Sequence, residues 1–296
     1  MKPPNPLILL VAAAVLFGGM FPVNRLAAEA GWPAFAFAFA PALIAGILTL
    51  GIGAVTRTGL SLSRQALIAD VVIGGLVIAM PIGILVNAAQ HLPASTLTLV
   101  LCLSPILTLL IAAATGSESF SGRVLFGMVL GTLGIALIVW PSSGVLAEGD
   151  SVWFLIALIA PVGFALANNC AAWLRPPAAP SISMATGTLL GGAVVAAVLA
   201  LVLQEPLWPD ETGAVQLLPL ALASIINAGF YFLFFWLVNA IGPARFSIFN
   251  YLAVAAGIVW SMVFFHELPA PVFWIAALLM LFGMHLALRP DRAARG

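Results

Sequence analysis

Ten long apolar runs, separated by short polar or proline- and glycine-containing connections, divide this sequence. Each run is close to the roughly 20 residues that an α-helix needs to cross the hydrocarbon core of a bilayer. Because a backbone inside lipid must satisfy its own hydrogen bonds, the runs predict an all-α polytopic membrane protein with ten transmembrane helices. The runs cover residues 7–23, 32–55, 67–89, 94–114, 124–140, 152–174, 181–203, 217–241, 246–265 and 272–288.

Composition agrees with a chain surrounded by lipid and leaves little room for other classes. Hydrophobic residues make up 63% of the chain and charged residues 7%, against about 45–50% and about 25% in soluble domains. Cys102 and Cys170 lie inside apolar runs, where packing is the expected role. Three dispersed histidines cannot form a metal cluster. We therefore expect the bilayer and a small-molecule substrate as partners, with no cofactor, no metal and no nucleic acid.

The basic residues predict the orientation of the helices. With the N-terminus in the cytoplasm, nine of the ten basic residues fall on the cytoplasmic side and Arg25 alone falls outside. Such an excess of Lys and Arg marks cytoplasmic loops, so both termini are predicted to be cytoplasmic. The first run ends in Pro22-Val23-Asn24-Arg25, which offers no convincing small-residue cleavage site, and we expect a retained helix rather than a signal peptide.

The second half of the sequence repeats the first at a spacing of 149 residues. If each half holds five helices, an odd number, the second half enters the membrane inverted, as in carriers that alternate access to a central site. We therefore predict two inverted five-helix repeats, residues 1–146 and 147–296. The matching residues are Glu118 and Glu267, Gly134 and Gly283, and Pro141 and Pro290, with Pro93-Ala94 matching Pro243-Ala244 to within one residue.

These repeat segments resemble the drug/metabolite transporter superfamily, in its ten-helix branch of two EamA-type repeats. The resemblance rests on Pro93-Ala94-Ser95, Glu118 and Gly134-Ile135-Ala136-Leu137-Ile138, and on Pro243-Ala244-Arg245, Glu267 and Gly283. Within the superfamily the chain is most similar to bacterial exporters of amino acids, including the aromatic amino acid branch. The resemblance implies a central path between helices 1, 3, 4, 6, 8 and 9, with helices 5 and 10 as a supporting pair. Pro105 corresponds to Ala255, which leaves the symmetry of gating open.

Polar and aromatic side chains within or at the ends of the apolar runs are the candidates for lining that path. Any single one could instead bond neighbouring helices together, at about 0.6 kcal/mol for an average interhelical hydrogen bond. Asn168 and Asn169 are the most indicative, because consecutive helical amides point about 100° apart and one neighbour cannot easily satisfy both. The candidates are Asn87, Gln90, His91, Ser95, Thr98, Asn168, Asn169, Asn227, Tyr231, Phe246, Asn250 and Tyr251.

Prolines and glycines within the runs predict where helices bend and where they pack. A proline removes a backbone hydrogen bond, so Pro22, Pro81 and Pro161 in path-lining helices are hinge candidates, although static kinks are equally common. Two small-xxx-small pairs, at positions 127 and 131 and at 187 and 191, favour close helix contacts. Packing within one chain is the simpler use, so we expect a monomer or a weak dimer.

The scarcity of charge within the runs narrows the mechanism. No charged residue lies near the middle of a run, and the nearest, Arg25, Asp70, Glu118 and Glu267, lie near ends. A buried carboxylate relay is not visible, so export is either facilitated, which we favour, or coupled through Glu118, Glu267 or His91. A path without full charges suits a neutral or zwitterionic solute with apolar bulk.

The sequence therefore predicts a secondary transporter of the bacterial cytoplasmic membrane that exports amino acids, aromatic or otherwise apolar, by alternating access. Carriers of drugs, nucleotide sugars or lipid precursors are the alternative within transport. An intramembrane enzyme is disfavoured, because the sequence has no HExxH, no GxSxG and no pair of intramembrane acids. A passive assembly or signalling subunit is disfavoured by the lack of room for a soluble domain.

Overall fold

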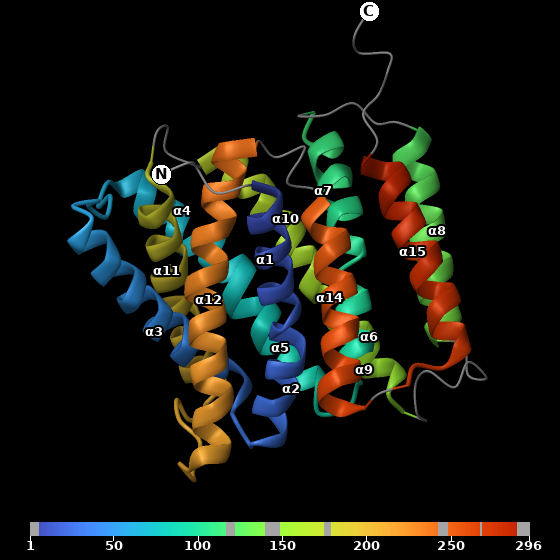
Figure 1. Ribbon diagram of the computed structural model, residues 1–296, viewed down its shortest axis with the longest axis horizontal. Coiled ribbons are helices and arrows are strands. Elements are labelled where there is room, and N and C mark those ends of the chain that lie inside the picture. Colours follow the sequence, from blue (N-terminus) through green and yellow to red (C-terminus); the bar gives the residue numbers. More distant parts are fainter. Residues whose placement is uncertain are drawn as a thin grey trace, which may run out of the picture.

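The structure is a computed structural model that describes residues 6–116, 122–139, 149–174, 179–241, 248–266 and 268–288. Every regular element in these ranges is a helix, and the helices lie side by side with their axes roughly aligned (Figure 1). The elements are α1 (Pro6–Gly18), α2 (Met20–Glu29), α3 (Ala34–Val55), α4 (Arg64–Gly74), the π-helix η1 (Gly75–Ala79), α5 (Met80–Ala88), α6 (Ala94–Val100), α7 (Leu103–Ala114), α8 (Gly122–Val139), α9 (Ser151–Ala157), α10 (Ile159–Leu174), α11 (Ser181–Val202), α12 (Ala214–Ile241), α14 (Ile248–Phe265) and α15 (Pro271–Leu288).

Seven stretches of the described residues are long and apolar enough to cross a membrane. They coincide with seven of the ten predicted runs, and α8, α14 and α15 fall on the other three as shorter apolar helices. The prediction of a multi-pass helical membrane protein is thus confirmed. The seven are Pro6–Glu29, Ala34–Val55, Arg64–Ala88, Ala94–Ala114, Ser151–Ala171, Ser181–Val202 and Ala214–Leu237.

Helix breaks inside these stretches lie about one turn before prolines. A proline has no N–H to donate to the carbonyl four residues earlier, so the helix is weakened just upstream of it. Pro22 follows the break between α1 and α2, Pro105 the break between α6 and α7, and Pro161 the break between α9 and α10. By contrast, Pro41 and Pro219 lie inside the unbroken helices α3 and α12. The hinge candidates Pro22 and Pro161 therefore lie at real interruptions of the helix.

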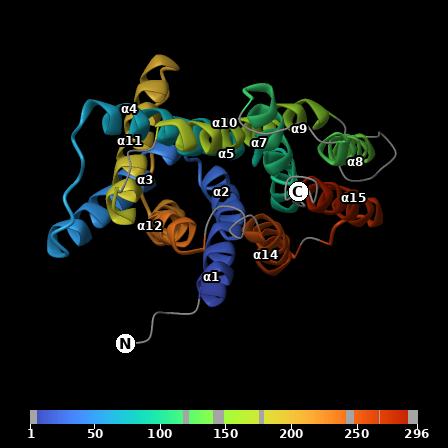
Figure 2. The same ribbon diagram turned by 90° about the horizontal axis from the view of Figure 1, so that it is seen from above.

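Seen from above, the helices form a central group flanked by two outer groups (Figure 2). One outer group is α3, α4 and α11, and the other is α8 with α15, which pack against each other. Gly134 of α8 meets Met280 and Gly283 of α15 meets Leu130, so the two repeat-related glycines lie in one helix–helix contact. The supporting pair implied for helices 5 and 10 is present.

The contacts that the first half makes with the second are matched by those that the second half makes with the first. α1 packs on α12 and α14, while α10 packs on α4, α5 and α7; likewise α3 packs on α12 and α4 on α11. The first span of the first half is α1 followed by α2, and the first span of the second half is α9 followed by α10. In Figure 1, α1 lies above α2 whereas α10 lies above α9, so the two equivalent spans run in opposite directions. This pattern is the one expected of two inverted repeats.

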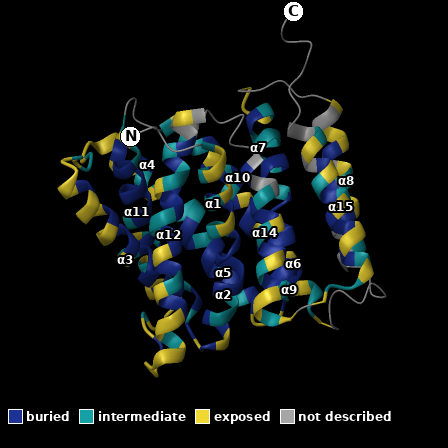
Figure 3. Cartoon of the chain, in the orientation of Figure 1, coloured by how far each residue is buried: buried dark blue, intermediate teal, exposed yellow. Residues whose placement is uncertain are grey.

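Buried residues concentrate on the inner helices, and exposed apolar residues cover the outer faces (Figure 3). Ile47 of α3 and Leu278 of α15 are among many large apolar side chains that are more than half exposed. Such a surface is stable against lipid tails but not against water. The outer faces of α3 and α15 are therefore predicted to face lipid.

A carboxylate from a distant connection caps α3. The backbone N–H of Phe35 in the first turn of α3 donates to Glu205 Oε2 at 3.0 Å, across 170 residues of sequence. An acidic side chain at a helix N-terminus satisfies a free donor and the helix dipole together, worth about 1 kcal/mol. We expect Glu205→Ala to lower the thermal unfolding midpoint by about 2–4 °C. Glu211→Ala, at an exposed position of the same connection, is the control, and equal midpoints would contradict the cap.

Candidate functional site

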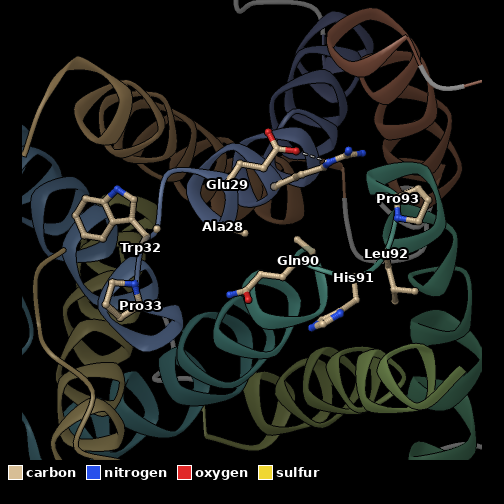
Figure 4. Close-up of a pocket in the computed structure, with 11 residues that line it drawn as sticks. Ala28, Glu29, Trp32, Pro33, Gln90, His91, Leu92 and Pro93 are labelled. Carbon is tan, nitrogen blue, oxygen red and sulfur yellow. Dashed lines mark hydrogen bonds and ion pairs between the residues drawn. The ribbon is translucent and has the colours of Figure 1, made fainter. Parts of the chain in front are cut away.

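A cavity of about 680 Å³ opens at the face where α2 and α5 end. One wall is the last turn of α2 with the following turn up to Pro33, and the other is the turn 89–93 between α5 and α6. Figure 4 shows the residues of both walls around an open space. We call this cavity the vestibule. Its volume is in the range of small-molecule sites.

The first wall of the vestibule carries one positive and one negative side chain. Arg25 Nε donates to Glu29 Oε1 at 2.8 Å, one turn further along α2 (Figure 4). The Arg25 guanidinium also lies 4.2 Å from the ring centre of Phe265, a cation–π contact that ties it to α14. The side chains of Arg25 and Glu29 remain 25% and 50% exposed. The wall thus presents opposite charges side by side, fixed in place yet open to a ligand.

The second wall brings together two of the predicted path residues, Gln90 and His91. Both are exposed and line the vestibule. The His91 ring stacks on Trp153 of α9, with ring centres 4.1 Å apart and an angle of 7° between planes. Asn87, one turn earlier in α5, is half-buried. This wall therefore offers an amide and a flat aromatic surface.

Two buried amides lie beyond the vestibule. Asn24 precedes Ala28 of the vestibule wall by one turn on α2 and is 2% exposed, and Asn227 on α12 is 4% exposed. Asn24 Oδ1 and Asn227 Nδ2 have no hydrogen-bond partner in the described structure. A buried polar atom left unpaired costs about 1–3 kcal/mol, so an open acceptor and an open donor indicate a place for a polar ligand or water.

The two amides lie at similar depth. α12 packs against α2, and Trp32 Nε1 donates to the Gln216 carbonyl at 3.0 Å, which aligns the vestibule ends of these segments. At 1.5 Å per residue, Asn24 lies about 12 Å and Asn227 about 17 Å from that end, a difference of roughly 5 Å along the axis. A solute the size of an amino acid could contact both.

An aromatic cluster lies deeper in the bundle than these amides. Phe17 lies seven residues before Asn24, about 10 Å further from the vestibule. Its ring centre lies 4.6 Å from that of Phe230, 5.6 Å from that of Phe249, and 6.2 Å from those of Phe21 and Phe164. The cluster joins α1, α2, α10, α12 and α14. It lies within the bundle, between the helices that carry the two amides and α10 and α14.

Tyr231 supports the π-helix next to the hinge candidate Pro81. Since Pro81 has no N–H, the Val77 carbonyl in η1 lacks its normal helix partner. The Tyr231 hydroxyl, on α12, donates to that carbonyl at 3.5 Å. Gly163 of α10 packs against the same turn, where a Cβ would lie 2.9 Å from the Leu76 carbonyl. Two neighbouring helices therefore hold this interruption.

Two predicted path residues on α6 serve packing. Thr98 is fully buried, its hydroxyl donates to the Ala94 carbonyl at 2.8 Å, and its side chain fills the space above Gly257 of α14. Ser95, on the same helix, is 3% exposed. Neither lines the vestibule. The structure places Thr98 at the contact between α6 and α14 and buries Ser95 on the same helix.

The premise that one neighbour cannot easily satisfy both Asn168 and Asn169 is wrong, while a role of these residues in the path stays a prediction. Both amides reach one residue on α7: Asn168 Nδ2 donates to Thr108 Oγ1 at 3.3 Å, and Asn169 Nδ2 donates to the Thr108 carbonyl at 3.2 Å. Asn169 also bonds the Ala165 carbonyl of its own helix at 2.9 Å. One threonine satisfies both because it offers a side-chain and a backbone oxygen. This pair links α10 to α7.

Three predicted path residues cannot be placed in this site. Phe246 lies outside the described residues, as do Glu118 and Glu267, the proposed coupling groups. Asn250 and Tyr251 belong to α14, but their side chains are not among those described.

Sequence reasoning missed Arg25, Glu29 and Asn24 as site residues. Arg25 is the single basic residue that the charge pattern places outside, and its spacing of four from Glu29 predicts an ion pair on one helix face. Asn24 stands six residues after Gly18, as Asn169 stands after Gly163. These signals were available, but each was read for topology or repeat rather than for binding.

Comparison with known families decides the class. The family model described as "EamA-like transporter family" matches residues 5–140 and again residues 151–289. The chain belongs to the EamA-like transporter family. The resemblance to EamA-type drug/metabolite transporters is thereby confirmed, and with it a membrane transporter rather than an enzyme family.

A solved structure described as "Crystal structure of protein" is similar to this EamA-family chain throughout its length. It shares 22% identity over 94% of this chain and 96% of its own, with a TM-score of 0.62, which shows a common fold. Comparison with curated proteins gives no match. Within the part of the chain that the structure describes, no three His, Cys, Asp or Glu residues are grouped to hold a metal ion.

Proposed function

We propose that this EamA-family protein is a secondary transporter that exports amino acids with apolar or aromatic side chains by alternating access. The observation that carries the proposal is the Arg25–Glu29 pair on the wall of the vestibule. A zwitterion has a carboxylate and an ammonium group next to each other, and this wall offers a cation and an anion whose Arg25 Nε and Glu29 Oε1 atoms lie 2.8 Å apart. Neutral overall, the wall favours neither an isolated anion nor an isolated cation.

The deeper path supplies the remaining contacts of an amino acid. The open Asn24 acceptor suits an ammonium group and the open Asn227 donor suits a carboxylate. Beyond them the rings of Phe17, Phe230 and Phe249 provide an apolar surface for the side chain. An amino acid that moves inward from the vestibule therefore exchanges one pair of complementary partners for another.

Ten membrane crossings, with the termini in the cytoplasm of a bacterial cell, fit the charges at the two faces. Glu29, Glu205 and Glu211 lie toward the vestibule face, and Arg57 and Arg64 toward the opposite face. By the distribution of basic residues the vestibule faces outward. The cluster around Phe17 then closes the inward side. It would open when the two repeats exchange their conformations, with Pro22, Pro81 and Pro161 as hinges.

The alternative of a nucleotide-sugar or phospholipid-precursor carrier has less support. Phosphate groups are held by several Arg or Lys side chains. Among the described residues that line the vestibule, Arg25 is a single Arg or Lys side chain rather than one of several. An uncharged drug would contact the aromatic rings but would have no charged group for Arg25 or Glu29 to bind.

Uptake into proteoliposomes tests this function. We expect saturable uptake of radiolabelled phenylalanine and methionine, with phenylalanine competed by other zwitterions and only weakly by phenethylamine, which lacks the carboxylate. One control is empty liposomes. The other is liposomes that hold the Asn227→Leu variant, which lacks the open donor. Absence of uptake for phenylalanine, methionine and threonine would contradict the proposal.

A further inference from the structure

We propose that Asp70, with Ser183 and Thr188 of α11, forms a proton-binding site that opens on the face opposite to the vestibule. The proposal concerns a carboxylate that the sequence places near the end of a run. In the structure Asp70 is the seventh residue of the span Arg64–Ala88, about 9 Å from its start. An ionisable side chain inside a membrane span is a candidate for function.

The Asp70 carboxylate lies in the contact between α4 and α11. A Cβ placed on Gly187 would overlap its carboxylate oxygens, and a Cβ on Gly191 would overlap the Asp70 backbone carbonyl. The glycines predicted as a packing face therefore provide the space into which Asp70 fits. The side chain is held between helices rather than extended into a connection.

A small cavity of about 20 Å³ adjoins the carboxylate, enough for one water molecule. Its polar lining is Ser61, Asp70, Ser183 and Thr188. Ser183 Oγ accepts a hydrogen bond from the Ser61 N–H at 3.4 Å. Thr188, in the same lining, is 2% exposed. The cavity is therefore lined by one carboxylate and three hydroxyl-bearing residues.

The cavity opens away from the vestibule. Ser61 and Ala179, which line it, belong to the connections that precede α4 and α11. The vestibule lies at the start of α3 and Ser61 lies beyond its end. A proton would thus reach Asp70 from the face that the basic residues assign to the cytoplasm.

Among the described residues, the helices packed against α4 bring no cation to Asp70. Of the helices packed against α4, α11 has no ionisable residue and α10 has Cys170. On its own segment, Arg57 and Arg64 are exposed and precede Asp70 by six residues or more. A single carboxylate is neutralised by one positive charge. A carboxylate with two hydroxyls gives few oxygen ligands for a metal ion. The proton is therefore the occupant that fits.

Proton binding at Asp70 can affect the vestibule because one continuous helical segment connects the two. α4 continues through η1 and the Pro81 turn into α5, which ends beside Gln90 and His91. A neutral Asp70 slides along the glycine face of α11 more easily than a charged one, because it gives up less solvation. This link rests on the proposed transport function, whereas proton binding itself does not.

Infrared spectroscopy of the purified protein in lipid nanodiscs tests the site without a substrate. We expect the wild-type minus Asp70→Asn spectrum to contain a carboxylic acid band that grows as pH falls and does not respond to exchange of K⁺ for Na⁺. Thr188→Val keeps the size of the side chain and removes the hydroxyl, so it should move the midpoint by about tenfold in proton concentration. Asp210→Asn, at an exposed position, should leave it unchanged.

A band that never appears between mildly acidic and mildly alkaline pH, or one abolished by Na⁺ alone, would overturn the proposal. If Asp70→Asn is poorly folded, the Thr188→Val titration still decides it, because that variant retains the carboxylate. Proteoliposome uptake separates the two hypotheses: a titrating Asp70 with no uptake of any amino acid would leave the proton site standing and remove the transport function.

Discussion

Replacing Gly74 by alanine is expected to lower the thermal unfolding midpoint by about 5–10 °C. Gly74 on α4 faces α11, where a Cβ would overlap the Gly192 amide nitrogen and the Thr188 carbonyl oxygen. Both are backbone atoms of a continuous helix and cannot rotate away as a side chain can. Overpacking against a rigid surface costs about 1–3 kcal/mol or more, so α4 must separate from α11.

Gly51→Ala is the matched control. Gly51 lies on α3, where a Cβ would meet nothing within 4 Å. Because alanine is the better helix former by about 1 kcal/mol, this change should leave the midpoint equal or slightly higher. Unfolding followed by tryptophan fluorescence in one detergent compares the two variants. Equal midpoints for Gly74→Ala and Gly51→Ala would contradict the close contact of α4 with α11.

The positions of the helices were predictable because lipid imposes a length and a polarity on every crossing. The residues at which the helices end were less predictable. The run 7–23 stops before Asn24 and Arg25, yet the span continues to Glu29. Asn24 is buried by neighbouring helices, and Arg25 is held by Glu29 and Phe265. Polarity along the sequence cannot report such tertiary partners.

The candidate site was predictable only where chain topology brings residues to one place. Gln90 and His91 were found because they end a span. Asn168 and Asn169 were misread because the partner that satisfies both, Thr108, lies 60 residues away. No periodicity identifies such a partner, since it depends on how α10 rotates against α7.

The two halves use an equivalent asparagine differently. Asn169 donates to two carbonyls and fixes α10 to α7, whereas its counterpart in the repeat, Asn24, keeps an unpaired oxygen. In a symmetric duplication both would be equally satisfied. The difference favours α2 and α12 as the side of the path that contacts solute in this conformation, with α10 as structural support.

Arg25→Gln is expected to reduce phenylalanine uptake at low substrate concentration by roughly 10- to 100-fold, the effect of losing a hydrogen bond to a charged group. The guanidinium is the positive group on the vestibule wall, so its removal leaves Glu29 without a counter-charge and a bound carboxylate without a partner. Uptake of phenethylamine, which has an ammonium group but no carboxylate, should fall little or rise.

The ratio of phenylalanine to phenethylamine uptake is therefore the decisive readout, because a folding defect would lower both rates alike. Arg64→Gln is the control: it removes the same charge from an exposed position at the start of α4, on the opposite face. It should keep the wild-type ratio. If Arg25→Gln also keeps that ratio, Arg25 does not bind the substrate carboxylate, and the ion pair only fixes α2 to α14 through Phe265.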